Sequence, residues 1–386
     1  MTDTKFHINF TRQIYIFFLL VYVIKDKKRK NNNFAKTNNI MKEKENKKPI
    51  EISELGEFGL IEYLTKDLTI IDKNLIKGIG DDCAVFESGG ICNLVTTDLL
   101  VEGIHFNLIY TPLKHLGYKA VAVNLSDIYA MNGTPKYITV SIAISRKFSV
   151  TAIEQLYEGI KLACDRFDVE LIGGDTTSSL SGLFINITAI GQANKDDIAY
   201  RNGAKKNDLI CVSGDLGGAY IGLKVLEREA KLYMDDKDIQ PELEGYEYVI
   251  ERQLKPEPRR DIVRELAKRR IIPNSMIDIS DGLSSELLHI CKQSGVGCRV
   301  YEDKIPIHEQ TEFVSNKFRL DSSLAAMNGG EDYELLFTVP IDKKDLVEEI
   351  NDVAIIGYIC DASNGNKFVA RNGVELDLKA QGWNAF

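Results

Sequence analysis

Short apolar runs alternate with amphipathic stretches from Ile52 to the end of the chain, and this alternation constrains the fold more than any other feature. Residues 93–99 and 137–144 are rich in β-branched side chains and predict strands, whereas residues 114–131 between them have helical spacing. Strands that alternate with helices are typical of folds in which helices cover a mixed sheet. The pattern therefore predicts an α/β fold of the α+β type.

The second half of the chain repeats this organisation after the polar segment 194–206. The whole chain has 386 residues, which are enough for two domains with separate cores. We predict domains over residues 51–195 and 196–386, each a mixed sheet packed with helices. Further predicted helices are 55–65, 151–167, 217–228, 259–270, 283–294 and 343–350, and further strands are 169–172, 183–191, 208–213, 276–279, 333–339 and 354–359.

Residues 1–50 have a different character and are predicted to lie outside both domains. The apolar stretch 14–24 is too short to span a bilayer, and the basic run 25–30 follows it. A signal peptide carries its positive charge before the apolar segment. This extension is interpreted as disordered or as a start-site artefact, with Met41 as the true start, and a weak membrane anchor is the alternative.

Aspartates recur in small, flexible surroundings that suit cation binding. Three apolar runs, interpreted as strands, end on Asp98, Asp175 and Asp281, and Asp82 and Asp127 extend the set. Carboxylates and hydroxyls are the oxygen ligands that Mg²⁺ prefers, and so many converging acids would repel one another without metal ions. The sequence therefore predicts metal-assisted phosphoryl chemistry with several Mg²⁺ ions.

Each motif also has a purely structural interpretation. The segments GIGDD (78–82) and GGDTT (173–177) are equally typical of turns, and Ser280 or Asp281 could cap the helix that follows. His105 and Arg201 could be ordinary structural residues, and core packing is the default role of Trp383. The glycine-rich loop 213–218 lacks the Lys-Ser/Thr ending of a P-loop.

Charge and cysteine usage narrow the class of protein further. A net charge of −9 argues against nucleic-acid binding through a broad basic face and implies that metal helps to neutralise any bound phosphate. The seven cysteines occur singly, without a C-x-x-C pair. Scattered thiols of this kind favour a reducing cytoplasm over a zinc site or a disulfide framework.

Seven motifs taken together resemble the thiamine-monophosphate kinase family. From about Leu55 to the C-terminus they occur in the family's order: GIGDDCA, TTDLLVEGIHF, VNLSDIYAM, IGGDTT, YRNGA, DISDGL and GGEDYEL. The resemblance implies transfer of the ATP γ-phosphoryl group to thiamine monophosphate, which is the last step in making thiamine diphosphate. It also implies a fold shared with aminoimidazole ribonucleotide synthetase, and a homodimer in which the first domains pair their sheets.

The resemblance also implies a role for individual residues. It implies that the protein has neither a membrane nor a nucleic acid as a partner. The first domain would bind ATP and metal and form the dimer, and the second would complete the nucleotide and substrate site. No catalytic general base is expected, because a phosphate monoester acceptor is already ionised near neutrality. The implied Mg²⁺ ligands are Asp82, Thr96, Thr97, Asp98, Asp127, Asp175, Asp278 and Asp281; the ATP contacts are Gly174, Asp175, Arg201 and Ser280; the substrate contacts are His105, Glu331 and Trp383.

The sequence departs from the family pattern in two places, and two other functions are alternatives. Trp383 stands where some members have tyrosine, and the N-terminal extension is long. One other function is that of a related ATP-using enzyme, such as a cyclo-ligase or a selenophosphate synthetase. The other is a catalytically silent protein that binds nucleotide or thiamine phosphate, and a measurement of ATP consumption distinguishes it from an enzyme.

Overall fold

The computed structural model describes residues 51–381, and the chain divides into two compact units. Of the described residues, 51–68 belong to one unit, which holds helix α3 (Ile52–Thr65); this helix confirms the predicted one and bends at Gly56. Residues 69–381 belong to the other unit. The predictions for residues 1–50 and Trp383 lie outside the described residues. Within the described part, no helix is both long and apolar enough to cross a membrane.

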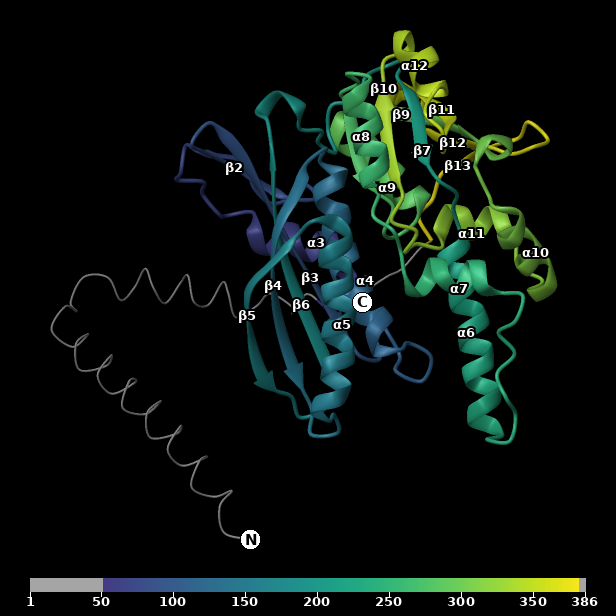
Figure 1. Ribbon diagram of the computed structural model, residues 1–386. Coiled ribbons are helices and arrows are strands. Elements are labelled where there is room, and N and C mark those ends of the chain that lie inside the picture. Colours follow the sequence, from purple (N-terminus) through teal and green to yellow (C-terminus); the bar gives the residue numbers. More distant parts are fainter. Residues whose placement is uncertain (1–50, 382–386) are drawn as a thin grey trace, which may run out of the picture. The chain divides into compact units, whose positions relative to one another are not determined.

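The first sheet has six strands in the order β1-β2-β3-β6-β4-β5 (Figure 1). Its strands are β1 (Leu75–Lys77), β2 (Ala84–Ser88), β3 (Ile91–Val101), β4 (Thr134–Ile144), β5 (Glu170–Ser178) and β6 (Leu183–Ala193). All pairings are antiparallel except that of β4 with β5. A parallel pair needs a crossover connection, which helix α5 (Val150–Phe167) supplies.

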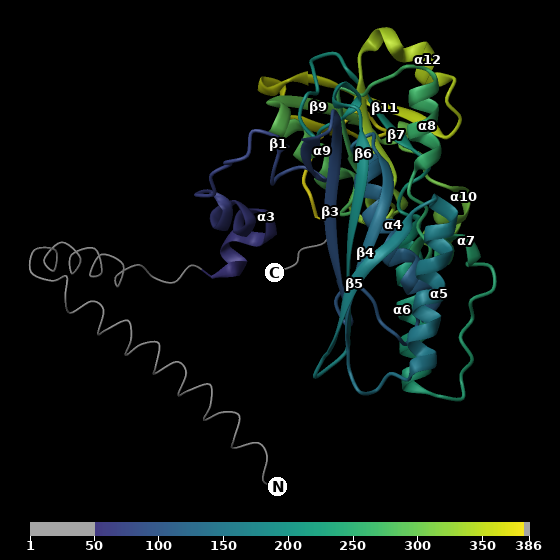
Figure 2. The same ribbon diagram turned by 60° about the vertical axis from the view of Figure 1, so that its left-hand side comes forward.

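Two helices cover one face of this sheet (Figure 2). Helix α4 (Leu113–Ala130) lies against the sheet and is buried along almost its whole length, and α5 packs against α4. The two helices approach closely at glycines: a Cβ on Gly117 would lie 2.0 Å from the Leu156 carbonyl oxygen, and one on Gly159 would lie 1.9 Å from that of Lys114. Helix α4 also contacts β8 (Ser275–Asp278) of the second sheet, so it carries side chains to both sheets.

The second sheet has seven strands in the order β13-β12-β9-β11-β7-β10-β8. Its strands are β7 (Leu209–Ser213), β8 (Ser275–Asp278), β9 (Val296–Tyr301), β10 (Leu335–Val339), β11 (Val353–Asp361), β12 (Asn366–Val369) and β13 (Glu375–Asp377). The associated helices are α6 (Gly218–Asp235), α7 (Glu247–Leu254), α8 (Arg260–Lys268), α9 (Leu283–Ser294), α10 (Glu309–Phe318), α11 (Ser322–Asn328) and α12 (Lys344–Glu348). Two mixed sheets packed with helices confirm the predicted fold class.

The expectation that Asp98 and Asp175 stand at strand tips is wrong. Strand β3 continues to Val101, which pairs with Phe184 of β6, and β5 continues to Ser178. The residues after Asp98 are Leu, Leu and Val, which fit a pleated, half-buried strand and extend the ladder past the acid. Asp98 therefore projects from within a strand. The third acid expected at a strand end, Asp281, is also misplaced by the prediction, because β8 already ends at Asp278.

Candidate active site

Three carboxylates from distant parts of the sequence converge at one place. Each of Asp82, Asp127 and Asp278 offers an oxygen, and these oxygens lie within 4.8 Å of one another. Asp82 precedes β2, Asp127 belongs to the last turns of α4, and Asp278 ends β8. The burial of α4 between the two sheets thus brings acids of both halves of the chain together.

Neighbouring side chains hold each of these acids in place. Thr96 Oγ1 donates to Asp127 Oδ2 (2.5 Å), and Ser126 Oγ donates to Asp278 Oδ2 (2.6 Å). Arg201 Nη2 and Nε both donate to Asp82 Oδ1, at 2.6 and 3.1 Å. The other oxygen of Asp82 is buried without a protein partner. Oriented carboxylates with spare oxygens are the donor set that a hard cation such as Mg²⁺ requires.

Burial and mutual repulsion disfavour the charged forms of these acids. Desolvation, followed by repulsion from neighbouring aspartates, raises the pKa of Asp98 to about 6 and that of Asp127 well above its usual range. Desolvation likewise raises the pKa of Asp82 to about 7 and that of Asp278 to about 6, although Arg201 opposes both shifts. A bound cation would offset this penalty, so the residues present fit a metal.

The thermal stability gained from Mg²⁺ is expected to increase with pH. Because the folded-state pKa values of Asp82, Asp98 and Asp278 lie above the usual 3.8, folded protein holds protons that unfolded protein releases. This contribution to the free energy of unfolding is full below pH 3.8 and is lost as pH rises toward 7. Mg²⁺ competes with those protons. Scanning calorimetry should show a small Mg²⁺-induced increase in Tm at pH 5 and a larger one at pH 8.

Potassium chloride at matched ionic strength is the control for this measurement. An increase in Tm with Mg²⁺ that is as large at pH 5 as at pH 8 would contradict the assignment of a cation to these acids.

The TTD segment presents its side chains to opposite faces of β3. Thr96 and Asp98 share the face toward α4, where the Asp98 amide donates to Asn124 Oδ1 (3.0 Å). Thr97 lies on the other face: its hydroxyl donates to the Ile187 carbonyl and accepts from the side chains of β6. The period of two residues in a strand dictates this division. The Thr97 hydroxyl therefore does not face the acids, and any contribution of Thr97 on that side would come from its main chain.

The loop after β8 is organised by a residue that the sequence analysis did not single out, Glu286. Its Oε1 accepts from the amides of Ser280 (3.1 Å) and Asp281 (2.8 Å), and its Oε2 is buried without a partner. Burial, with the Asp281 charge second, raises the pKa of Glu286 to about 8. Helix α9 starts at Leu283 after Gly282, so the capping alternative for Ser280 and Asp281 is wrong.

The predicted nucleotide residues lie on different elements. Gly174 and Asp175 belong to β5, an edge strand with every residue exposed, and Asp175 is outside the group of three converging acids. A Cβ on Gly174 would lie 1.8 Å from the Val140 carbonyl oxygen, so the pairing of β5 with β4 requires glycine there. Arg201 contacts Asp82, and its amide donates to Asp81 Oδ1 (3.1 Å), which joins it to the acid cluster.

The predicted substrate residues have two described members. His105 Nδ1 accepts from the Val101 amide (3.0 Å) just after β3. Glu331 forms an ion pair with Lys119 of α4 (3.0 Å) and accepts from Gln253 of α7 (2.7 Å). Neither Lys119 nor Gln253 was predicted from the sequence, because an isolated Lys or Gln in a helical pattern is typical of a solvated face.

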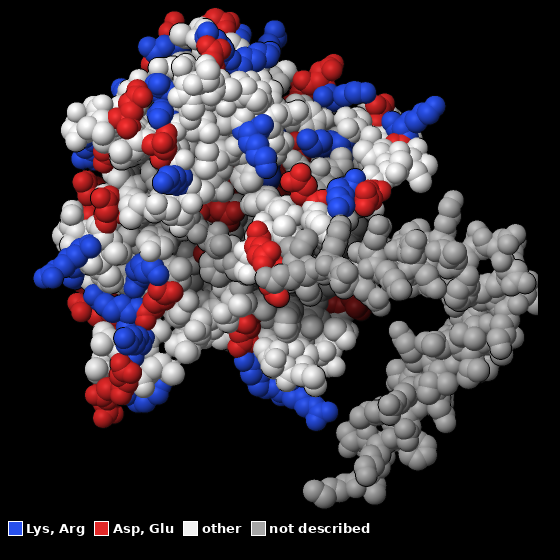
Figure 3. All heavy atoms as spheres, turned by 180° about the vertical axis from the view of Figure 1, so that it is seen from behind, with Lys and Arg blue, Asp and Glu red and all other residues white. Residues whose placement is uncertain are grey.

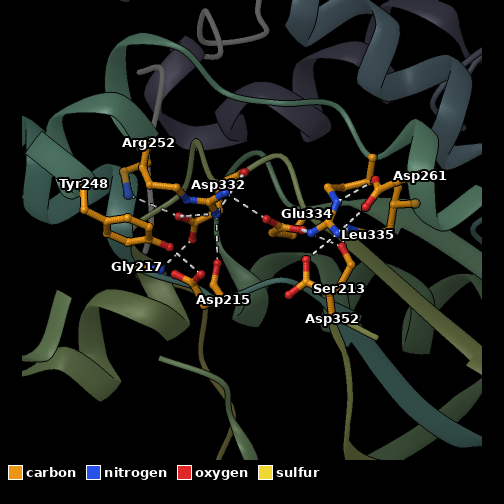
Figure 4. A network of polar contacts seen from close by, with 12 residues as sticks. Ser213, Asp215, Gly217, Tyr248, Arg252, Asp261, Asp332, Glu334, Leu335 and Asp352 are labelled. Carbon is orange, nitrogen blue, oxygen red and sulfur yellow. Dashed lines mark hydrogen bonds and ion pairs between the residues drawn. The ribbon is translucent and has the colours of Figure 1, made fainter. Parts of the chain in front are cut away.

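A buried polar network follows Glu331 in the chain (Figure 4). Asp332 accepts from the amides of Gly217 (2.7 Å) and Ala219 (3.3 Å), at the start of α6. Arg252 and Arg259 both pair with Glu334, which is 1% exposed. The Asp332 carboxylate thus binds the main-chain amides where the glycine-rich loop 213–218 leads into α6. These amides hold the GGEDYE segment in place instead of binding phosphate.

The sequence matches two consecutive domain families. Residues 80–193 match the AIR synthase related protein, N-terminal domain, and residues 205–369 match its C-terminal domain. Over 340 residues the chain is 33% identical to the thiamine-monophosphate kinase of Bacillus subtilis, covering 86% of this chain and all of that one. The chain belongs to the thiamine-monophosphate kinase family.

Other members of the thiamine-monophosphate kinase family agree with this assignment. The enzyme of Buchnera aphidicola subsp. Schizaphis graminum is 37% identical over 342 residues, covering 86% of this chain and 99% of its own. A solved structure, AaThiL complexed with AMPPCP and TMP, aligns with a TM-score of 0.74 at 32% identity and covers 88% of this chain and all of that chain. The site residues predicted from the family motifs remain predictions for this chain.

Proposed function

We propose that this protein transfers the γ-phosphoryl group of ATP to thiamine monophosphate and releases thiamine diphosphate and ADP. The convergence of Asp82, Asp127 and Asp278 from both halves of the chain is the observation that carries the proposal. The family relationship and the relative complexed with AMPPCP and TMP support the choice of substrates. Phosphoryl transfer depends mainly on alignment and charge neutralisation, which clustered carboxylates with a bound cation provide.

The side chains have separate proposed roles. The carboxylates of Asp82, Asp127 and Asp278 would hold Mg²⁺, together with Thr96, the main chain of Thr97, Asp98, Asp175 and Asp281. The bound cation would neutralise phosphate charge during the transfer. Arg201, Ser280 and Gly174 would contact the nucleotide, and His105, Glu331 and Trp383 would contact thiamine monophosphate. The acceptor is an ionised phosphate, with a second pKa of about 6, so the reaction needs no general base.

ADP release in the presence of different acceptors tests this proposal. The purified protein with ATP and Mg²⁺ should release ADP rapidly when thiamine monophosphate is present, and at no more than background rate with unphosphorylated thiamine. Equal ADP release with and without thiamine monophosphate would refute the proposal and favour a related ATP-using enzyme. ATP binding without release of ADP would indicate a binding protein.

We further propose a homodimer that forms through the first sheet. Strand β5 is exposed along its whole length, and Leu99, Leu171 and Ile172 expose large apolar side chains on β3 and β5. Large apolar side chains exposed on a sheet are typical of an interface, and a second copy of this sheet would bury those on the face that it covers. Light scattering should give the mass of two chains, and the mass of one chain at micromolar concentration would contradict this.

The remaining predictions concern location and other partners. All seven cysteines are buried free thiols, which supports a reducing cytoplasm as the proposed location. On the face drawn in Figure 3, Lys and Arg are interspersed with Asp and Glu, and this mixture supports the expectation that nucleic acid is not a partner.

A further inference from the structure

We infer that Lys119 and Gln253 act as positioning residues, which fix the Glu331 carboxylate as an oriented hydrogen-bond acceptor for the ring system of thiamine monophosphate. The inference rests on the proposed function, because Glu331 is there a substrate residue. It adds two residues, one from α4 and one from α7, to the determinants of substrate affinity.

The contacts occupy both oxygens of Glu331. Lys119 Nζ lies 3.0 Å from Glu331 Oε1 and also donates to the Gln253 carbonyl oxygen (3.0 Å). Gln253 Nε2 donates to Glu331 Oε2 (2.7 Å). Lys119 and Gln253 are only 4% and 5% exposed, whereas the Glu331 side chain is 29% exposed. Two buried donors thus hold an acceptor that is still open to a ligand.

The main chain of Glu331 is fixed as firmly as its side chain. Glu331 and Tyr333 have positive φ values of 59° and 52°, a backbone conformation that residues other than glycine rarely adopt. Such backbone persists where surrounding contacts impose it, and it is common at active sites. Here consecutive residues of α7 hold consecutive residues of the loop: Arg252 pairs with Asp332, and Gln253 holds Glu331 (Figure 4 shows the Arg252 side). The loop is therefore preorganised.

The charge of Lys119 defines the kind of contact that Glu331 makes. An ammonium ion within 3.0 Å compensates the carboxylate, so Glu331 offers the substrate directed lone pairs more than a free negative charge. The amino group of the thiamine pyrimidine is a donor that suits such an acceptor. Burying a lysine on a helix where Leu116, Ala120 and Val123 are also buried is costly, and an apolar residue in its place can be neutral or stabilising.

The position of Lys119 on α4 matches the shape of the substrate. Lys119 and Asp127 are eight residues apart on the same side of the helix, a separation of about 12 Å at 1.5 Å per residue. The acids lie toward one end of this stretch and Glu331 toward the other. That arrangement fits an extended molecule with a phosphate at one end and rings at the other.

Steady-state kinetics of Lys119→Met test the inference. We expect the KM for thiamine monophosphate to rise by about tenfold or more, with the KM for ATP nearly unchanged, because a hydrogen bond to a charged group is lost. In a Glu331→Gln background, Lys119→Met should add little further change. Lys114→Met is the matched control, since Lys114 of the same helix pairs with the exposed Glu158 and should leave both KM values unchanged.

A second variant tests the inference independently, in case Lys119→Met does not fold. Gln253→Met removes the donor to Glu331 Oε2 at similar volume and should also raise the KM for thiamine monophosphate selectively. Folded variants with an unchanged KM for thiamine monophosphate, or with equal increases for both substrates, would overturn the inference while the proposed function stands. Wild-type protein that does not turn over thiamine monophosphate would overturn both.

Discussion

Replacing Asp127 with asparagine is expected to abolish phosphoryl transfer and, at the same time, to raise the Tm of the metal-free protein. Asp127 carries a strongly raised pKa because it is desolvated and faces Asp98, Asp278 and Asp82. Asparagine has nearly the same shape and can still accept from Thr96, but it removes one of the repelling charges. Loss of a metal ligand should lower kcat by a factor on the order of a hundred to a thousand.

Scanning calorimetry in a chelating buffer and the ADP-release assay measure the two effects on the same preparation. Asp165→Asn is the matched control, because Asp165 is exposed on α5 and should change neither Tm nor kcat appreciably. A lowered Tm for Asp127→Asn would indicate that this carboxylate stabilises the fold. In that case the proposed metal role would lose its main physical support.

Replacing Arg259 with methionine is expected to destabilise the protein by about 3–5 kcal/mol, because it leaves a buried carboxylate without one of its partners. Glu334 is 1% exposed and accepts from Ser213, Arg252 and Arg259, all at 2.5 to 2.9 Å. The same guanidinium also contacts Asp261 and Asp352, so one substitution disrupts several contacts of the network in Figure 4.

The neighbouring Arg260 supplies a control for this measurement. It pairs with Asp168, whose side chain is 79% exposed, and its guanidinium lies over the Phe167 ring. Methionine keeps the apolar stem, so Arg260→Met should cost only about 1 kcal/mol. Urea denaturation of both variants gives the two free energies of unfolding. Equal effects of Arg259→Met and Arg260→Met would show that the buried network does not stabilise the second half of the chain.

The elements around Asp127 could be predicted from the sequence because their patterns are local. The helical spacing at 114–131 and the β-branched segments on either side correspond to α4, β3 and β4 within three residues at each end. The acids could be singled out for the same reason, since aspartate beside glycine or a hydroxyl residue is unusual on a strand. Their convergence within 4.8 Å follows only from the packing of α4 between two sheets.

Other parts of the site depend on contacts between segments far apart in the sequence. Lys119, Arg252 and Gln253 have the side chains of a solvated helix face, and nothing nearby marks them as buried. Their burial results from partners 78 to 212 residues away in the GGEDYE loop. Helix α7 itself was not predicted, because it is short and follows an acidic, weakly patterned segment. The predicted strand 93–99 is shorter than β3, because a charged residue at position 98 interrupts the apolar pattern near its end.

The fate of the γ-phosphoryl group distinguishes transfer to thiamine monophosphate from hydrolysis of ATP. Phosphorus NMR of a reaction with ATP, Mg²⁺ and thiamine monophosphate follows ATP loss, ADP formation and thiamine diphosphate formation in one sample. We expect ADP and thiamine diphosphate to appear in equal amounts, without accumulation of inorganic phosphate. ADP formed together with inorganic phosphate, while thiamine monophosphate stays unchanged, would contradict it.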